Sequence, residues 1–213
     1  MVAARRPGSP LRAKMIRDLK AGWKSFLSIL LISMLSTALF MGLDATWRGM
    51  WDNVQNQFAQ GNLSDIWVNG EISDNDARQI ADLHGVKAVQ RRVVAEAEAW
   101  DLDGKPKIKL LMSEGTPAVN QPIVYEGRGF APGAKNECVL QQRFAAAHHL
   151  AVGDVLAVSV GGRKLDLVIA GLGVMPEFVM FQKGSELVTP AGSYGYACLS
   201  PGTLGFMPFS EIT

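Results

Sequence analysis

Few residues of this 213-residue chain have the types and spacing that chemistry requires. His148 and His149 are adjacent, and on a helix their side chains would point about 100° apart, which is poor geometry for binding one metal ion. Glu96 and Glu98 alternate along an expected strand, where a solvated face explains both without any acid–base pair. We therefore expect these histidines and glutamates to lie on the surface.

Motifs for nucleotides and for nucleophilic catalysis are also missing. The chain has no Gly-x4-Gly-Lys-Ser/Thr loop to cradle a phosphate through backbone N–H groups. Gly171 and Gly173 begin like a dinucleotide fingerprint, but the third glycine and the helix that should follow are absent. The spacing of the three histidines identifies no catalytic triad. We predict that the chain is not an enzyme and has no catalytic residues, no metal ligands and no cofactor.

Charge is sorted along the chain. The net charge is only +1, yet residues 1–24 hold seven basic side chains and one acidic one, for a net +6, whereas residues 25–213 carry a net −5. The acidic balance of the larger part disfavours nucleic acid as a partner. The boundary between the two parts is an apolar run.

Residues 25–43 contain no charged side chain. Nineteen helical residues span roughly 28 Å, close to the ~30 Å hydrocarbon core of a bilayer, which predicts a transmembrane helix. Basic residues precede the run, so the N-terminus is expected in the cytoplasm and residues 44–213 outside it. A cleaved signal peptide has a shorter apolar region and a small-x-small cleavage site, and a soluble core helix rarely runs this long without a charge.

Residues 1–24 are predicted to form a cytoplasmic, basic amphipathic helix with Leu11, Met15, Leu19 and Trp23 on its apolar face. A helix lying on anionic membrane lipid is the favoured interpretation of this pattern. The other interpretation is a coupling face that contacts a cytoplasmic partner.

The helix is expected to continue beyond the bilayer as an extracytoplasmic stalk over residues 44–60. Trp47 and Trp51 suit the membrane–water interface, and Gly61-Asn62 is a plausible helix stop. Within the span, small residues four apart would let a neighbouring helix approach closely: Ser33 and Thr37, and Ala38 and Gly42.

Residues 61–213 alternate between short strands and helices, which predicts an α+β domain. Expected strands are residues 64–69, 86–100, 105–112 and 138–140, with helices after Ser73 (capped with Asp76) and at 141–150, and a Gly/Pro-rich loop at 115–133. A hairpin at 155–160 and 163–169 turns at Gly161-Gly162, and the rest, from Gly171, has strand-and-loop character. Cys138 and Cys198 would both lie outside, where a disulfide is permitted but not required by their spacing.

Three sets of residues together resemble an ABC transporter permease of the FtsX-like/MacB type. Residues 19–42 resemble its first membrane helix. The second set resembles the extracytoplasmic core domain of the family. It consists of Glu126-Gly127-Arg128, CVLQQRFA at 138–145, LAVGD at 150–154 and the hairpin that follows. The third set resembles the variant of the family that has large ectodomains and a duplicated permease unit. It consists of LSDIWV at 63–68, GVKAV at 85–89 and MPEFV at 175–179.

The resemblance implies a permease subunit of a bacterial inner or plasma membrane. ATP hydrolysis by a separate nucleotide-binding subunit would move the extracytoplasmic domain, for export or mechanotransmission. Implied partners are that ABC ATPase subunit, other permease transmembrane helices or a second permease copy, and membrane lipid. The family's later membrane helices are not in this sequence, so we expect an N-terminal part with an incomplete domain at 61–213. The alternatives are a stand-alone membrane-anchored binding or sensor domain and, third, an anchored hydrolase.

Overall fold

The computed structural model describes residues 10–178, 190 and 192–213, and the chain divides into the units Met1–Asn53 and Val54–Thr213. The first unit contains α1 (Pro10–Ala21) and most of α2 (Trp23–Gln60). Arg5 and Arg6 of the predicted basic helix, and Val179 of the MPEFV stretch, lie outside the described residues.

The break between the two helices is at Gly22. Its N–H donates to the carbonyl of Asp18 at 2.9 Å, while the N–H groups of Ser25 and Phe26 donate to its own carbonyl at 3.0 and 3.2 Å. One helix therefore ends where the next begins. The predicted single helix over residues 1–24 is corrected accordingly, because Trp23 belongs to α2 and not to the helix of Leu11.

Helix α2 has 38 residues, none of them buried within the chain. At 1.5 Å per residue it is roughly 57 Å long, which exceeds the hydrocarbon thickness of a bilayer. Among the described residues it is the one helix long and apolar enough to cross a membrane. Phe40 and Leu43 are 74% and 72% exposed, and such apolar surface needs an apolar environment. The division of α2 into a membrane part and a stalk stays a prediction.

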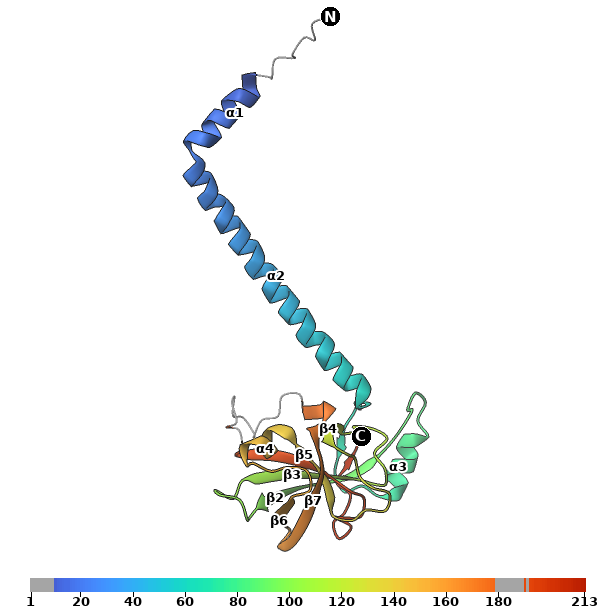
Figure 1. Ribbon diagram of the computed structural model, residues 1–213. Helices are drawn as coiled ribbons and strands as arrows, with labels where there is room; N and C mark the ends of the chain where they lie inside the picture. The colour runs from blue at the N-terminus through green and yellow to red at the C-terminus, as the bar shows by residue number, and fades with distance from the viewer. Residues whose placement is uncertain (1–9, 179–189, 191) are drawn as a thin grey trace, which may run out of the picture. The chain divides into compact units, whose positions relative to one another are not determined.

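Figure 1 shows the strands of the second unit. Within its described part, the strand pairing closes six of them into a barrel. Around the barrel their order is β2 (Arg91–Ala99), β3 (Lys107–Ser113), β8 (Tyr194–Leu199), β5 (Glu137–Gln141), β7 (Arg163–Val174) and β6 (Val155–Val160). The circuit closes where Glu98 and Ala99 of β2 pair with Ser159 and Val158 of β6. The β3–β8 and β5–β7 pairs are parallel and the other pairs of the circuit are antiparallel.

The barrel interior is filled by alternate residues of its strands, because successive side chains of a strand point to opposite faces. Small alanines of β2 face larger aliphatic side chains of the other strands, and Phe144 of α4 (Gln142–Ala147) packs against them. The main interior residues are Val93, Ala95, Ala97, Ala99, Ile108, Leu110, Met112, Cys138, Leu140, Leu156, Val158, Val160, Leu167, Ile169, Ala197 and Leu199.

A second apolar cluster covers the outer face of β3, β5 and β8, and contains Leu111, Val139, Tyr196 and Cys198. Cys138 belongs instead to the interior cluster. The two cysteines therefore lie on opposite faces of neighbouring strands, and both are free and buried. Their spacing permitted a disulfide, and the fold does not form one.

Peripheral elements extend this framework. Strand β9 (Glu211–Ile212) pairs with β2 and with the two-residue β1 (Val68–Asn69), and β4 (Ile123–Gly127) pairs with β7. The α3 helix (Asp74–Ala81) begins with the predicted capping box of Ser73 and Asp76, and η1 (Pro176–Phe178) is a single 3-10 turn.

The α+β architecture and the hairpin at Gly161-Gly162, where φ is 54° and 77°, are confirmed. Three local predictions are wrong in extent. The strand at 64–69 is reduced to β1, the strand at 86–100 begins only at Arg91, and the helix at 141–150 spans α4 alone. The predicted loop at 115–133 contains β4, an edge strand hidden in the sequence by the flanking prolines and glycines.

Gly195 of β8 tests how tightly α4 covers the barrel. An added Cβ would lie 2.3 Å from Cδ2 and 2.6 Å from Cγ of Phe144, which is itself 1% exposed. We predict that Gly195→Ala lowers the free energy of unfolding by about 1–3 kcal/mol through overpacking. Urea denaturation followed by near-UV circular dichroism measures the loss. Gly129→Ala, with no heavy atom within 4 Å of the new Cβ, is the control, and equal midpoints for both variants would contradict the packing.

Candidate functional site

The last turn of α2 ends inside a set of hydrogen bonds. The N–H of Gly61 donates to the carbonyl of Gln57 at 2.9 Å, and the N–H of Leu63 donates to the carbonyl of Phe58 at 3.0 Å. Asn62 has a φ of 49°, the left-handed conformation that reverses the chain after a helix. The helix thus stops at the predicted Gly61-Asn62. Gly61 is also required sterically, because a Cβ would lie 2.5 Å from Cγ of Pro176.

The loop at residues 116–121 receives the chain as it leaves α2. The N–H groups of Asn120 and Gln121 donate to the carbonyls of Asn62 and Gly61 at 3.0 and 2.7 Å. In return, Nδ2 of Asn62 donates to the carbonyl of Ala118 at 2.6 Å. These bonds run in both directions between residues 56 to 60 positions apart in the sequence, so the helix end and the loop are held as one piece.

Asn120 adds a buried side-chain pair to this contact. Its Oδ1 accepts the N–H of Ser64, and its Nδ2 donates to Oγ of Ser64, both at 2.9 Å. Asn120 is 3% exposed and Ser64 9% exposed, so these polar groups are satisfied by one another rather than by water.

Gln90, the residue before β2, connects the same loop to the barrel. Its Oε1 accepts the N–H groups of Ala118 and Val119 at 2.8 and 3.1 Å, and its Nε2 donates to the carbonyls of Glu114 and Thr116 at 3.3 Å. Its backbone pairs with that of Thr213 by two bonds of 2.9 Å. We call residues 57–64, Gln90 and residues 114–121 the junction. Through Gln90 the junction joins the end of α2 to β2.

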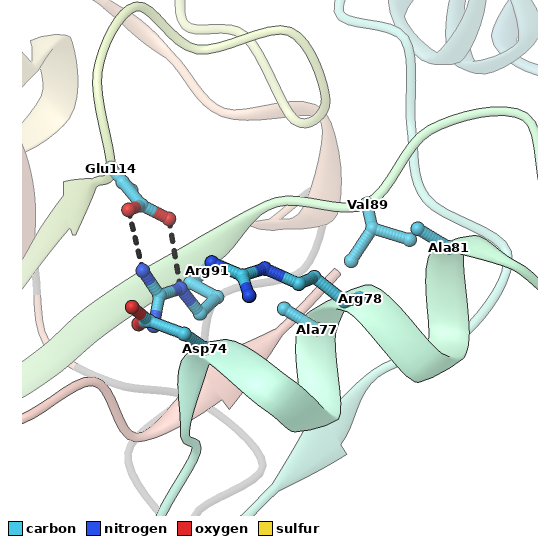
Figure 2. A pocket seen from close by; sticks show the side chains of 7 residues that line it. All are labelled: Asp74, Ala77, Arg78, Ala81, Val89, Arg91 and Glu114. Atoms are coloured by element: carbon cyan, nitrogen blue, oxygen red, sulfur yellow. Dashed lines mark hydrogen bonds and ion pairs between the residues drawn. The ribbon is translucent and has the colours of Figure 1, made fainter.

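Arg91, the first residue of β2, extends the junction to α3. Its guanidinium forms a fork with Glu114, with Nε–Oε2 at 2.8 Å and Nη2–Oε1 at 2.5 Å, and also bonds Asp74 (Figure 2). It lies 4.4 Å above the ring of Phe209. The two hydrogen bonds with Glu114, and then the one with Asp74, raise the pKa of Arg91, so it is a permanent cation.

Arg92 points to the other side of β2 and is buried. It bonds both oxygens of Glu177 at 2.6 Å and Oε2 of Glu211 at 2.8 Å, and all three side chains are less than 10% exposed. Burial on its own would lower the pKa of Arg92, and the hydrogen bonds with Glu177 and Glu211 outweigh it and raise the pKa. The residue ties η1 and β9 to β2.

The motifs that carried the family resemblance have structural contacts. Arg128 forks onto Glu137 with bonds of 2.9 and 2.6 Å, and the N–H of Ala131 adds a third bond of 2.9 Å. The Arg128 bond and then the Ala131 bond lower the pKa of Glu137 to about 2. Asp154 of the LAVGD stretch accepts the N–H of Ala151 at 2.8 Å and closes the turn before β6.

The proposed coupling residues are placed on two helices. Leu11, Met15 and Leu19 of α1 are 78%, 64% and 48% exposed, and Trp23 of α2 is 54% exposed. Within the described residues, no other part of the chain buries these apolar side chains. That they contact a partner stays a prediction.

The predicted packing and anchoring residues all lie along α2. Oγ1 of Thr37 donates to the carbonyl of Ser33 at 2.8 Å, which satisfies the hydroxyl within the helix. The surface over Ala38 and Gly42 is open, and Trp47 and Trp51 are 61% and 55% exposed. Helix packing at Ser33, Thr37, Ala38 and Gly42, and interface anchoring by the two tryptophans, also stay predictions.

His148 is not the surface residue that was predicted. It is half-buried, its Nε2 lies 2.8 Å from the carbonyl oxygen of Gly192, and its ring packs on Phe144 with centroids 4.6 Å apart. His149, Glu96 and Glu98 are exposed as predicted. Within the described residues, no three His, Cys, Asp or Glu side chains gather as metal ligands do. Burial raises the pKa of both Cys138 and Cys198 to about 12, so neither is a reactive thiolate.

A family model described as the MacB-like periplasmic core domain matches residues 25–203. The chain belongs to this family. The match confirms the resemblance to extracytoplasmic domains of FtsX/MacB-like ABC transporter permeases, and the α+β fold class with it. With the apolar α2, it describes a membrane-anchored protein with an extracytoplasmic domain.

Two solved structures are similar to this MacB-like chain. One is the extracellular domain of the noncanonic ABC-type transporter YknZ from Gram-positive bacteria, with 16% identity, a TM-score of 0.45 and coverage of 66% of this chain and 71% of that chain. The other is the periplasmic region of MacB from Actinobacillus actinomycetemcomitans, with 10% identity, a TM-score of 0.39 and coverage of 68% and 64%. No curated protein matches the chain.

The junction of this MacB-like domain was missed by sequence reasoning. Gln90 and Asn120 belong to no motif, and their side-chain partners lie 24 to 56 residues away. Arg92, outside the junction, was missed for the same reason, because its partners lie 85 and 119 residues away. The one local signal in the sequence was the helix stop at Gly61-Asn62, which marks the α2 half of the contact and says nothing of the loop that receives it.

Gln90→Leu should loosen the junction while leaving the barrel folded. The leucine removes the acceptor of the Ala118 and Val119 N–H groups. We predict that amide hydrogen exchange at these two residues accelerates about fivefold or more, since each lost bond is worth about 1 kcal/mol. Exchange of the β3 amides should stay unchanged. Gln142→Leu on α4 is the control, and unchanged exchange at Val119 in Gln90→Leu would show that Gln90 does not hold the loop.

Proposed function

We propose that this chain is the N-terminal part of an FtsX/MacB-type ABC transporter permease that transmits movement between the two sides of a membrane. ATP hydrolysis by a separate nucleotide-binding subunit would drive that movement, for export or mechanotransmission. The observation that carries the proposal is the helical continuity of α2, whose apolar part and hydrogen-bonded end belong to one 38-residue helix.

The junction supports transmission because its contacts are directional. A displacement of Gly61 or Asn62 stretches hydrogen bonds to Gln121, Asn120 and Ala118, and does not slide over an apolar surface. Gln90 passes the displacement to the start of β2. An α-helix with all its internal hydrogen bonds is a stiff element, so α2 suits the role of a transmitting rod.

The orientation we propose follows from the sorted charge. Seven Lys and Arg residues precede the apolar run within residues 1–24, whereas Arg48 is the one basic residue in the thirty positions that follow it. Residues 1–24 would therefore stay in the cytoplasm and residues 44–213 would lie outside it. Trp47 and Trp51 would then lie at the outer interface, and Ser33, Thr37, Ala38 and Gly42 would pack against other permease helices or a second permease copy.

Helix α1 is the element we propose to contact the ATPase subunit. Its exposed Leu11, Met15 and Leu19 offer an apolar face, and its basic residues suit the anionic lipid surface beside that contact.

Three substitutions to aspartate test the coupling face. We predict that Leu11→Asp, Met15→Asp and Leu19→Asp together abolish co-purification of the nucleotide-binding subunit, because charged side chains cannot be buried unpaired at the contact. Carbonate extraction of membranes checks that the chain still inserts. Leu11→Met, Met15→Leu and Leu19→Met together, which keep the face apolar and the basic residues in place, form the control. Full retention of the ATPase by the apolar-face variant would remove α1 from the coupling role.

Cysteine labelling tests the orientation. The native cysteines, Cys138 and Cys198, are only 0% and 2% exposed and should react little with a label. The labelling of a single added cysteine therefore reports which side of the membrane that cysteine lies on. We predict that a membrane-impermeant maleimide reaches Lys135→Cys in intact cells and reaches Ala4→Cys only after lysis. The reverse pattern would invert the topology, and the transporter assignment would fail with it.

A further inference from the structure

A pocket of about 320 Å³ lies between α3 and the start of β2 (Figure 2). Its apolar lining consists of Ala77, Ala81 and Val89. Its charged lining consists of Asp74, Arg78, Arg91 and Glu114. A volume near ~300 Å³ is at the lower end of the range for small-molecule sites, which fits a ligand of one or two amino-acid residues.

The charges around this pocket are paired in an unexpected way. Asp74 and Arg78 are four residues apart on α3, the spacing at which opposite charges normally pair on a helix. Asp74 bonds Arg91 instead. Within the part of the chain that the structure describes, the Arg78 side chain has no ion pair or hydrogen bond, and Figure 2 shows its guanidinium extending across the pocket toward Arg91.

Arg91 itself is not available to a ligand as a free cation. Its guanidinium is held by Glu114 and Asp74, and its side chain is only 10% exposed. These two carboxylates and one guanidinium leave one negative charge in excess beside the unpaired Arg78. A purely anionic ligand would be repelled by that excess and a purely cationic one by Arg78. A ligand with both charges matches the site.

We propose that this pocket binds a small zwitterion, with the size of an amino acid or a dipeptide. The ligand carboxylate is held by Arg78, whose planar fork matches a carboxylate. Its ammonium group lies against Asp74, of which only one oxygen bonds Arg91 and whose side chain is 68% exposed. A short aliphatic side chain rests on Ala77, Ala81 and Val89. This inference does not depend on the transporter role.

Methyl NMR on the full chain in lipid nanodiscs tests the proposal. We expect titration with L-alanyl-L-alanine or with L-alanine to shift the methyl signals of Ala77, Ala81 and Val89, and the stronger of the two identifies the size class. The N-acetylated dipeptide lacks the ammonium group and the dipeptide amide lacks the carboxylate, so both should bind about fivefold or more weakly. The proposal would be overturned if neither zwitterion shifted these methyl signals. It would also be overturned if a blocked form bound as strongly as the zwitterion.

Arg78→Gln provides the matched variant. Because Arg78 is exposed on α3, the substitution should leave the capping box and the barrel intact. We expect it to weaken zwitterion binding about fivefold or more, because a charge-assisted fork is lost, whereas Arg143→Gln, which removes an exposed arginine from α4, should leave binding unchanged. Binding that survives Arg78→Gln unchanged would rule out the assigned carboxylate contact.

Discussion

The carboxamide of Gln90 is the group on which the connection between helix and barrel depends. A loop that follows a strand and receives a helix end has backbone N–H and C=O groups that no regular element pairs, and any such group that is buried without a partner is costly. Gln90 is 7% exposed and serves two N–H groups with its oxygen and two carbonyls with its nitrogen. Glutamate would supply the acceptor without the donor, and a lysine the donor without the acceptor.

The two arginines that follow Gln90 bind different segments of the domain to the two faces of β2. Neighbouring residues of a strand point to opposite faces, so Arg91 and Arg92 meet different carboxylates. Arg91 joins α3 and the end of β3 at a partly open surface, while Arg92 joins η1 and β9 from a buried position. A buried cation with two carboxylates adds little net stability over an apolar replacement, but removing one member would leave an unpaired buried charge. The network therefore fixes which segments can lie beside β2.

Sequence reasoning succeeded where a structure is decided by residues close together in the chain. The turn at Gly161-Gly162, the capping box at Ser73 and the apolar stretch of α2 each depend on neighbours within a few positions. The register of β8 between β3 and β5 depends on segments that are distant in the sequence, and no local pattern encodes it. His148 was assigned to the surface because its helical position was judged alone, whereas Phe144 and the Gly192 carbonyl half-bury it.

The closed barrel determines what a displacement of the junction can do. Strand β2 pairs with β3 along most of its length and also with β6 and β9, so it cannot slide along one neighbour without breaking pairs with another. An open sheet could absorb the same displacement by shear at its edge. Because the interior is packed with interdigitating side chains, the barrel also resists deformation across its width. Movement delivered at Gln90 would therefore carry the barrel as a body, and any change of shape would fall on the peripheral segments, α3, β1 and β4.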